Sequence, residues 1–107
     1  MKTRITELLA IRHPIVQAGM NYAAYPALVA AVSNAGGLGI LGAGSMSGEE
    51  LRQNIRAIRA LTDKPFGVNL LATSPILDEL VDVMIEEKIP VASYGYQYWH
   101  DLSYILR

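Results

Sequence analysis

The chain has 107 residues, 51% of them apolar, and its nine lysines and arginines against ten aspartates and glutamates give a net charge of -1 at pH 7. This length fits one domain at most, and so balanced a charge offers no electrostatic footprint for nucleic acid. The absence of cysteine excludes a disulfide framework and thiolate zinc sites, and it is compatible with a reducing cytoplasm, where we expect the protein to reside.

Residues 14–48 carry no charged side chain, which raises the question of a membrane span. Pro26, Asn34 and the five glycines of residues 33–44 interrupt this segment, whereas a span needs about 20 continuous apolar residues in a helix. We therefore expect no membrane segment and interpret the stretch as buried strands and helices of an α/β protein. Because a small domain buries only about 60 to 65% of its surface, the composition also fits a piece of something larger.

The first twelve residues predict one or two helical turns, and residues 15–18 predict a first strand with an exit loop at 19–21. His13 falls at the amino end of this strand. In a parallel α/β fold that end serves stability, so we interpret His13 as structural.

A first long helix is expected from Pro26 to a left-handed stop at Gly36, followed by a strand over residues 38–41. Gly42 and Gly44 leave bare backbone where this strand ends, which lets a flat ligand come close. The predicted buried stripe of the helix consists of Leu28, Ala31, Val32 and Ala35.

Gly37, Gly39 and Gly42 match the dinucleotide-binding pattern G-x-G-x-x-G. That fingerprint requires a strand before the glycines and a helix opening at the last of them. Here a helix precedes them and they lie inside the strand, so we do not interpret the pattern as a nucleotide site.

The next helix begins at a predicted capping box, Ser47 with Glu50, and an apolar stripe runs along it. Residues 65–71 predict a third strand whose polar member near the carboxyl end is Asn69. The stripe is Leu51, Ile55, Ile58 and Leu61, and the opposite face, Arg52, Arg56 and Arg59, is expected to be solvated.

Ser74-Pro75 predicts the start of a third long helix reaching Lys88, and residues 91–94 predict a fourth strand. The helix carries the apolar positions Leu77, Leu80, Val81, Met84 and Ile85. Strands recurring about every 25 residues with a helix between them indicate a parallel βαβ sheet, either an open doubly wound sheet or part of a (β/α)8 barrel.

Residues 96–107 differ in character, since they hold the single tryptophan and three of the six tyrosines. Without accompanying lysines they do not predict a nucleic-acid site. His100 and Asp101 are adjacent, but no nucleophile is placed for them, and we interpret them as surface residues.

Four segments together resemble the amino-terminal part of the nitronate monooxygenases, FMN enzymes formerly called 2-nitropropane dioxygenases. They are residues 5–9 (ITELL), 14–20 (PIVQAGM), 30–39 (AAVSNAGGLG) and 61–69 (LTDKPFGVN). The flavin-dependent enoyl-acyl-carrier-protein reductases share these motifs, and these residues do not separate the two substrates, nitronate and enoyl thioester.

The resemblance implies that residues 1–95 form about four β/α units of a TIM barrel, with a divergent tail at 96–107. It implies FMN at the carboxyl ends of the strands, against Ala18, Gly19, Met20, Gly42, Gly44 and Asn69. The family's catalytic histidine and phosphate loops lie beyond this chain's end, so no catalytic residue and no metal site is expected here.

The expected function is therefore oxidation of alkyl nitronates with O2 by way of FMN, in a truncated segment inactive alone. A fragment of an enoyl-acyl-carrier-protein reductase and a non-enzymatic half-barrel are the alternatives. The expected partner is a small-molecule substrate, without nucleic acid or membrane, and open sheet edges predict self-association.

Overall fold

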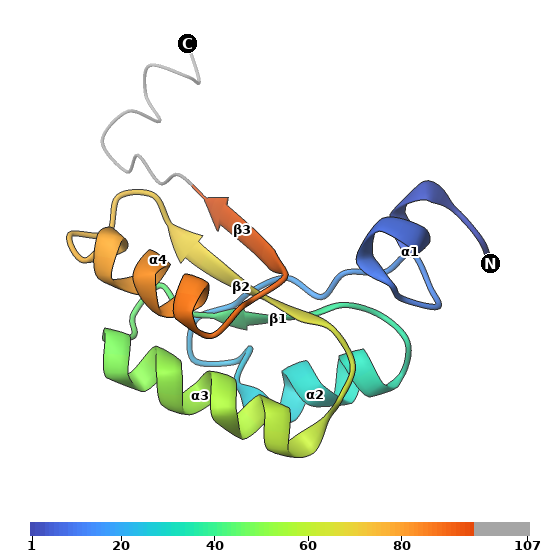
Figure 1. Cartoon of the computed structure of the whole chain (residues 1–107), viewed down its shortest axis with the longest axis horizontal. Helices are drawn as coiled ribbons and strands as arrows, with labels where there is room; N and C mark the ends of the chain where they lie inside the picture. The colour runs from blue at the N-terminus through green and yellow to red at the C-terminus, as the bar shows by residue number, and fades with distance from the viewer. Residues whose placement is uncertain (96–107) are drawn as a thin grey trace, which may run out of the picture.

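The computed structural model describes residues 1–95, which form a parallel β-sheet with three helices packed on one of its faces (Figure 1). A short helix, α1, lies beyond the amino ends of the strands. The elements are α1 (Arg4–Leu9), α2 (Pro26–Asn34), β1 (Gly39–Gly42), α3 (Gly48–Leu61), β2 (Phe66–Leu71), α4 (Leu77–Glu86) and β3 (Val91–Gly95). The predicted tail and the pair His100 and Asp101 lie outside the described residues.

The sheet has the order β1-β2-β3, and both pairings are parallel. Consecutive strands are joined by α3 and α4, which confirms the predicted βαβ pattern. The register sets Gly42 opposite Asn69 and Asn69 opposite Ser93, so these positions share one edge of the sheet, at the carboxyl ends of the strands.

The predicted strand at residues 15–18 is wrong beyond its second residue. The structure has a single parallel bridge between Val16 and Leu38, held by two backbone hydrogen bonds of 2.9 Å. The next pairing position is taken by a side chain: the Gln17 Oε1 accepts from the Ile40 N–H at 3.2 Å, and its Nε2 donates to the Ile40 carbonyl at 3.0 Å. Because this amide offers the same donor and acceptor as a peptide group, it replaces the backbone of a longer strand.

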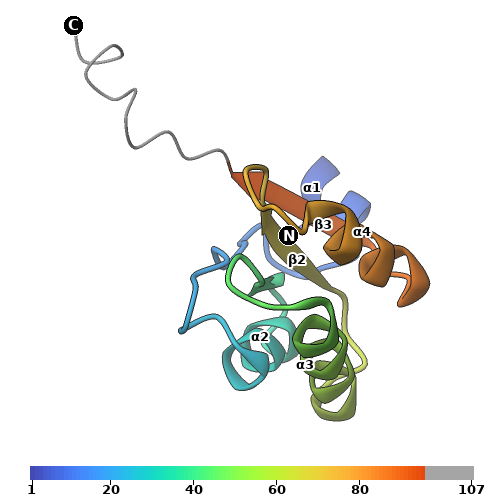
Figure 2. The same ribbon diagram turned by 90° about the vertical axis from the view of Figure 1, so that its left-hand side faces the viewer.

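The core lies between the sheet and the three helices. Leu41 and Val68 from the strands and Leu51, Ile55 and Leu80 from the helices are fully buried. Along β2 the core residues Phe66, Val68 and Leu70 occupy alternate positions, so one face of the sheet packs on helices and the other faces away from them (Figure 2).

Three helical stripes differ from their predictions. The buried face of α2 is Val29, Ala30 and Ser33, whereas Leu28 is 38% exposed. Nearly every position of α2 is apolar, so the spacing of its apolar residues does not identify which face of the helix is buried. Leu61 and Ile85 are also exposed, at 55% and 69%, because neither has a neighbouring element among residues 1–95 to cover it.

The helix ends follow local chemistry. The Ser47 hydroxyl accepts from the Glu50 N–H at 3.2 Å, which is the serine half of the predicted capping box. Gly36 has a φ of +102°, which confirms the left-handed stop after α2. Ser74 is not the cap of α4: its hydroxyl accepts from the N–H of Ile76, which is itself the N-cap. Within residues 1–95, no helix is long and apolar enough to cross a membrane.

Candidate functional site

The carboxyl edge of the sheet brings most of the predicted site residues together on its helix-free face. A side chain at Gly19 would begin 2.5 Å from the Asn69 Cβ and 3.1 Å from the Ile40 Cγ2. The loop carrying Ala18, Gly19 and Met20 therefore lies directly across Asn69. Such close approach requires glycine at position 19.

Asn69 is fixed by a neighbour that the sequence did not single out. The Ser93 hydroxyl donates to the Asn69 Oδ1 at 2.8 Å across the β2–β3 register. The structure gives the Asn69 Nδ2 no partner within residues 1–95, so its two donors remain available on the open face. Sequence analysis does not identify Ser93 as a partner of Asn69, because the pairing register of β2 with β3 is needed to place the two residues side by side.

Gly42 and Gly44 lie beside the same loop, and the protein's own chain fills the space that their side chains would take. A Cβ at Gly42 would lie 2.5 Å from the Met20 carbonyl oxygen, and one at Gly44 would lie 2.9 Å from the Leu71 Cδ1. Whether these glycines also contact a flavin stays a prediction. Met20 is 46% exposed and available as an apolar contact.

The side chain of Gln17 holds the backbone of the loop at residues 18–20 against β1. Its Nε2 donates to the carbonyl of Ala18 as well as to that of Ile40. One side chain thus joins the loop to β1 and fixes where Gly19 and Met20 lie. No feature of the sequence separates Gln17 from the other residues of a predicted strand.

The chemistry of this edge is that of recognition. Gln17, Asn69 and Ser93 are neutral hydrogen-bonding groups, and Ala18, Met20 and the glycines are apolar. Among residues 1–95 no group of three or more His, Asp or Glu side chains is placed to hold a metal ion. The arrangement can orient a flat, hydrogen-bonding ligand, but it has no ionisable side chain to transfer a proton.

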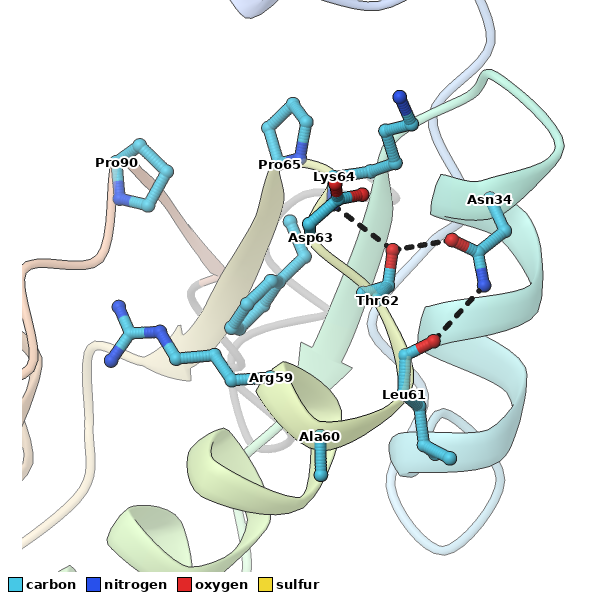
Figure 3. A pocket seen from close by; sticks show the side chains of 10 residues that line it. Asn34, Arg59, Ala60, Leu61, Thr62, Asp63, Lys64, Pro65 and Pro90 are labelled. Carbon is cyan, nitrogen blue, oxygen red and sulfur yellow. Dashed lines mark hydrogen bonds between the residues drawn. The ribbon is translucent and has the colours of Figure 1, made fainter.

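A cavity of about 780 Å³ lies at the opposite end of the sheet. It is lined by residues including Arg59, Lys64 and Pro90. Figure 3 shows that its wall is a structural junction: the Thr62 hydroxyl donates to the Asn34 Oδ1, and the Asn34 Nδ2 donates to the Leu61 carbonyl at 3.2 Å. These bonds fasten the end of α3 to the end of α2. Because active sites of β/α barrels form at the carboxyl ends of strands, we do not place the site here.

His13 lies near the same amino-terminal end, as predicted. Its backbone N–H donates to the Gly36 carbonyl at 2.9 Å, and its ring lies where a side chain at Gly36 would start. These contacts hold the segment before the bridge against the stop of α2.

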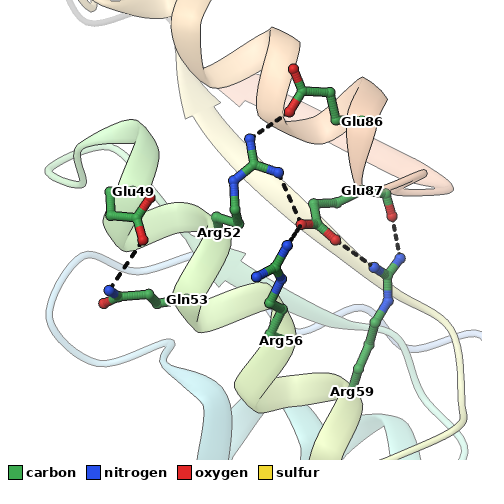
Figure 4. Close-up of polar contacts among 7 residues, drawn as sticks. All are labelled: Glu49, Arg52, Gln53, Arg56, Arg59, Glu86 and Glu87. Atoms are coloured by element: carbon green, nitrogen blue, oxygen red, sulfur yellow. Dashed lines mark hydrogen bonds and ion pairs between the residues drawn. The ribbon is translucent and has the colours of Figure 1, made fainter.

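The arginine face of α3 is not simply solvated. Arg52, Arg56 and Arg59 all donate to the Glu87 carboxylate, at 3.0, 3.2 and 3.1 Å (Figure 4). Arg52 also pairs with Glu86. Partial burial raises the pKa of Glu87, but hydrogen bonds and charges from Arg52 and Arg56 outweigh it and hold that pKa below its ordinary value. This cluster joins α3 to α4 and takes no part in the site.

Comparison with known proteins gives a consistent picture. A family model described as nitronate monooxygenase matches residues 2–99. Over 95 residues the chain is 46% identical to (3aS,4S,5R,7aS)-5-hydroxy-7a-methyl-1-oxo-octahydro-1H-indene-4-carboxyl-CoA dehydrogenase of Rhodococcus jostii, covering 89% of this chain and 27% of that protein. Over 74 residues it is 51% identical to a probable nitronate monooxygenase of Staphylococcus saprophyticus, covering 69% and 21%.

Two solved structures match as well. FabK from Thermotoga maritima superposes with a TM-score of 0.88 at 50% identity, over 97% of this chain and 35% of that one. Nitroalkane oxidase from Streptomyces ansochromogenes gives 0.77 at 30% identity, over 86% and 35%. Both are TIM barrels, and this chain corresponds to about a third of each. It spans about a quarter of the length of the curated relatives.

Proposed function

This chain belongs to the nitronate monooxygenase family, and from that premise we propose that it is the first part of an FMN-dependent oxidoreductase that oxidises alkyl nitronates with O2. The family and its FabK-like neighbours are flavoproteins in general. In this proposal residues 1–95 supply the first four β/α positions of the barrel, counting the Val16 bridge as the first, and one side of the flavin ring site. The cytoplasmic location expected from the sequence belongs to the same proposal.

The observation that carries the proposal is the Asn69 amide at the carboxyl edge of the sheet. Its Oδ1 is occupied by Ser93, which leaves the Nδ2 donors to face a ligand. The edge of a flavin ring presents carbonyl acceptors, so an oriented amide donor fits it. Met20 adds a polarizable apolar contact, and the small residues 18 and 19 let a flat ring lie close to backbone.

Bound FMN would supply the electron transfer to O2. The residues of this chain would bind the ring and hold its orientation: Asn69 by donating to it, Ser93 by fixing the amide, and Gln17 by holding the loop. None of these side chains takes the proton of the substrate, so that step belongs to residues outside the described ones.

A second candidate is an enoyl-acyl-carrier-protein reductase. The observation that favours it is the 50% identity to FabK from Thermotoga maritima, against 30% to nitroalkane oxidase. The open face of the sheet offers the same flavin contacts for either reaction, so the choice rests on substrate assays. A half-barrel without enzymatic activity is the third possibility.

A chimera tests these proposals. Residues 1–95 replace the corresponding residues of the Staphylococcus saprophyticus relative, and flavin absorbance, O2 uptake with an alkyl nitronate and NAD(P)H oxidation with an enoyl thioester are measured. We expect a yellow protein that consumes O2. A folded but colourless chimera would contradict the flavin site, and thioester reduction without nitronate oxidation would favour the second candidate.

The role of Asn69 is tested in the same chimera. Asn69→Ala removes one hydrogen bond to the ring and is expected to weaken FMN binding by about tenfold, the equivalent of about 1 to 1.5 kcal/mol. Asn54→Ala is the matched control, because Asn54 lies on α3 and donates to the Glu50 carbonyl far from the site. Equal affinity in both variants would remove Asn69 from the ring site.

A further inference from the structure

The four methionines of the chain all lie within the described residues, and they differ sharply in exposure. Met46 and Met84 are 3% and 7% exposed and belong to the core, whereas Met20 is 46% exposed. The Met46 sulfur is also engaged, because the Asn54 Nδ2 donates to it at 3.7 Å. Met1 is exposed too, but it precedes α1, away from the carboxyl edge of the sheet. Met20 is therefore the methionine that is both accessible and part of the candidate site.

The structural contacts of the Met20 loop are made by backbone. The Met20 carbonyl oxygen accepts from the Ala24 N–H at 2.8 Å and from the Ala23 N–H at 3.3 Å. The same oxygen lies 2.5 Å from where a side chain at Gly42 would start, and in Figure 1 the loop passes beside the arrowhead end of β1. None of these contacts involves the thioether. A chemical change at the sulfur can therefore alter the site and leave the loop in place.

The thioether of methionine has one characteristic reaction with peroxides. Hydrogen peroxide transfers an oxygen atom to the sulfur: the O–O bond breaks, an S=O bond forms, the sulfur loses two electrons and water is released. The product, methionine sulfoxide, is polar and chiral, and methionine sulfoxide reductases convert it back to methionine. Oxidation of Met20 would thus replace a polarizable apolar contact with a polar group.

We propose that Met20 is a reversible oxidation site through which hydrogen peroxide controls flavin binding. The proposal rests on the function proposed above, because the Met20 sulfur matters to the site as an apolar contact for the ring. A sulfoxide placed against an aromatic ring gives up bound water and gains no hydrogen-bond donor in return, which opposes binding. Oxidation of the flavin-free protein therefore weakens its binding of FMN, and reduction of the sulfoxide restores it.

Mass spectrometry tests the selectivity of oxidation on the 107-residue protein itself. The folded protein is treated with hydrogen peroxide and digested, and the gain of one oxygen atom is followed at each methionine. We expect Met20 to react within about threefold of the rate of N-acetylmethionine amide, and Met46 and Met84 at least about tenfold more slowly. A Met20 as slow as Met46 would overturn the proposal, and so would equally rapid oxidation of all three.

A pair of substitutions separates an effect on the site from an effect on the fold. Met20→Gln puts a polar group of similar length on the half-exposed side chain and should leave the urea midpoint close to that of the wild type. Met46→Gln is the matched control in the core and should lower the midpoint clearly, because it buries an amide. Equal drops in the two variants would mean that oxidation of Met20 acts by unfolding the protein, which contradicts the proposal.

The consequence for the ring is measured in the chimera described above, as equilibrium binding of FMN to its flavin-free form. Peroxide treatment should weaken binding by about tenfold, and methionine sulfoxide reductases should restore it. Met20→Leu keeps an apolar side chain that peroxide does not oxidise, so it controls for methionines elsewhere in the chimera. The same treatment should weaken FMN binding by that variant less than about twofold.

The outcomes distinguish this proposal from the proposed function. Equal losses of affinity in the two chimeras would overturn the control by Met20, because oxidation would then act at other residues. An affinity that peroxide leaves unchanged would overturn it as well. A folded chimera that binds no FMN before any treatment would refute the flavin site and, with it, the consequence of oxidation for the ring, whereas the selective oxidation of Met20 is decided by mass spectrometry alone.

Discussion

Replacing Gly39 with alanine is expected to destabilise the fold through the contact between β1 and α2. An added Cβ would lie 2.2 Å from the Val29 carbonyl oxygen and 2.9 Å from its carbonyl carbon. Ordinary van der Waals contact begins at about 3.4 Å, so α2 would have to withdraw by about 1 Å. The obstacle is helix backbone rather than a flexible side chain, and no rotamer change relieves it.

The cost has two sources. Overpacking of a close contact costs about 1 to 3 kcal/mol. Withdrawal of α2 also stretches the 3.1 Å hydrogen bond from the Gly39 N–H to the buried Ser33 hydroxyl, which adds about 1 kcal/mol. We therefore expect Gly39→Ala to lower the free energy of unfolding by about 2 to 4 kcal/mol.

Gly95→Ala is the matched control, because a Cβ at Gly95, also in a strand, meets nothing within 4 Å among the described residues. Both substitutions reduce the entropy of the unfolded chain equally, so their difference isolates the clash. Urea unfolding followed by circular dichroism measures it. Equal midpoints for the two variants would refute the claim that β1 and α2 touch through Gly39.

Three further predictions concern other parts of the chain. Gly36→Val should lower the free energy of unfolding by about 1 to 3 kcal/mol, because valine does not readily adopt a φ of +102°; an unchanged urea midpoint would show that the position is not strained. Glu87→Gln should cost about 1 to 2 kcal/mol at neutral pH, since the three arginine bonds are partly screened by solvent. The pKa of Glu87 in the folded protein lies below the ordinary 4.5, so its carboxylate stabilises the fold above pH 4.5 and this stabilisation is lost as the pH falls through the folded-state pKa. The urea midpoint of the wild type should therefore drop on acidification more than that of the variant. Parallel pH profiles of the two proteins would contradict this. Purified as 107 residues, the protein should be colourless and inactive on alkyl nitronates, because its described site offers contacts to the flavin ring but no group for the phosphate; stoichiometric flavin absorbance would disprove this.

The sequence predicted the elements that have a strong local signal. Pro26 and Gly36 bound α2, Ser47 caps α3, and the recurrence of short apolar runs indicated the parallel sheet. Sequence-based prediction failed where contacts with segments distant in the chain determine the local structure. The face of α2 is chosen by the close approach of Gly39 to Val29, and the strand at residues 15–18 gives way to a Gln17 side chain that no periodicity reveals.

The candidate site was predictable only in part for the same reason. Asn69 stood out as a polar residue near the end of a buried strand, and its position at the carboxyl edge follows from the parallel topology. Ser93, which fixes its amide, becomes visible only through the register of β2 with β3. The convergence of three arginines on Glu87 depends on how α3 and α4 lie against each other, and a helical wheel of α3 alone predicts a solvated face.

The glycines of the G-x-G-x-x-G pattern show what such spacing means in this fold. Gly37, Gly39 and Gly42 each lie where another segment's backbone oxygen approaches, with Cβ distances of 3.0 Å to Ile15, 2.2 Å to Val29 and 2.5 Å to Met20. The three oxygens come from the bridge segment, from α2 and from the loop at the site. Each of the three positions requires glycine because a backbone oxygen of a neighbouring segment occupies the space of a side chain. Since the last of these contacts seats the Met20 loop on β1, the pattern positions the loop of the candidate flavin site.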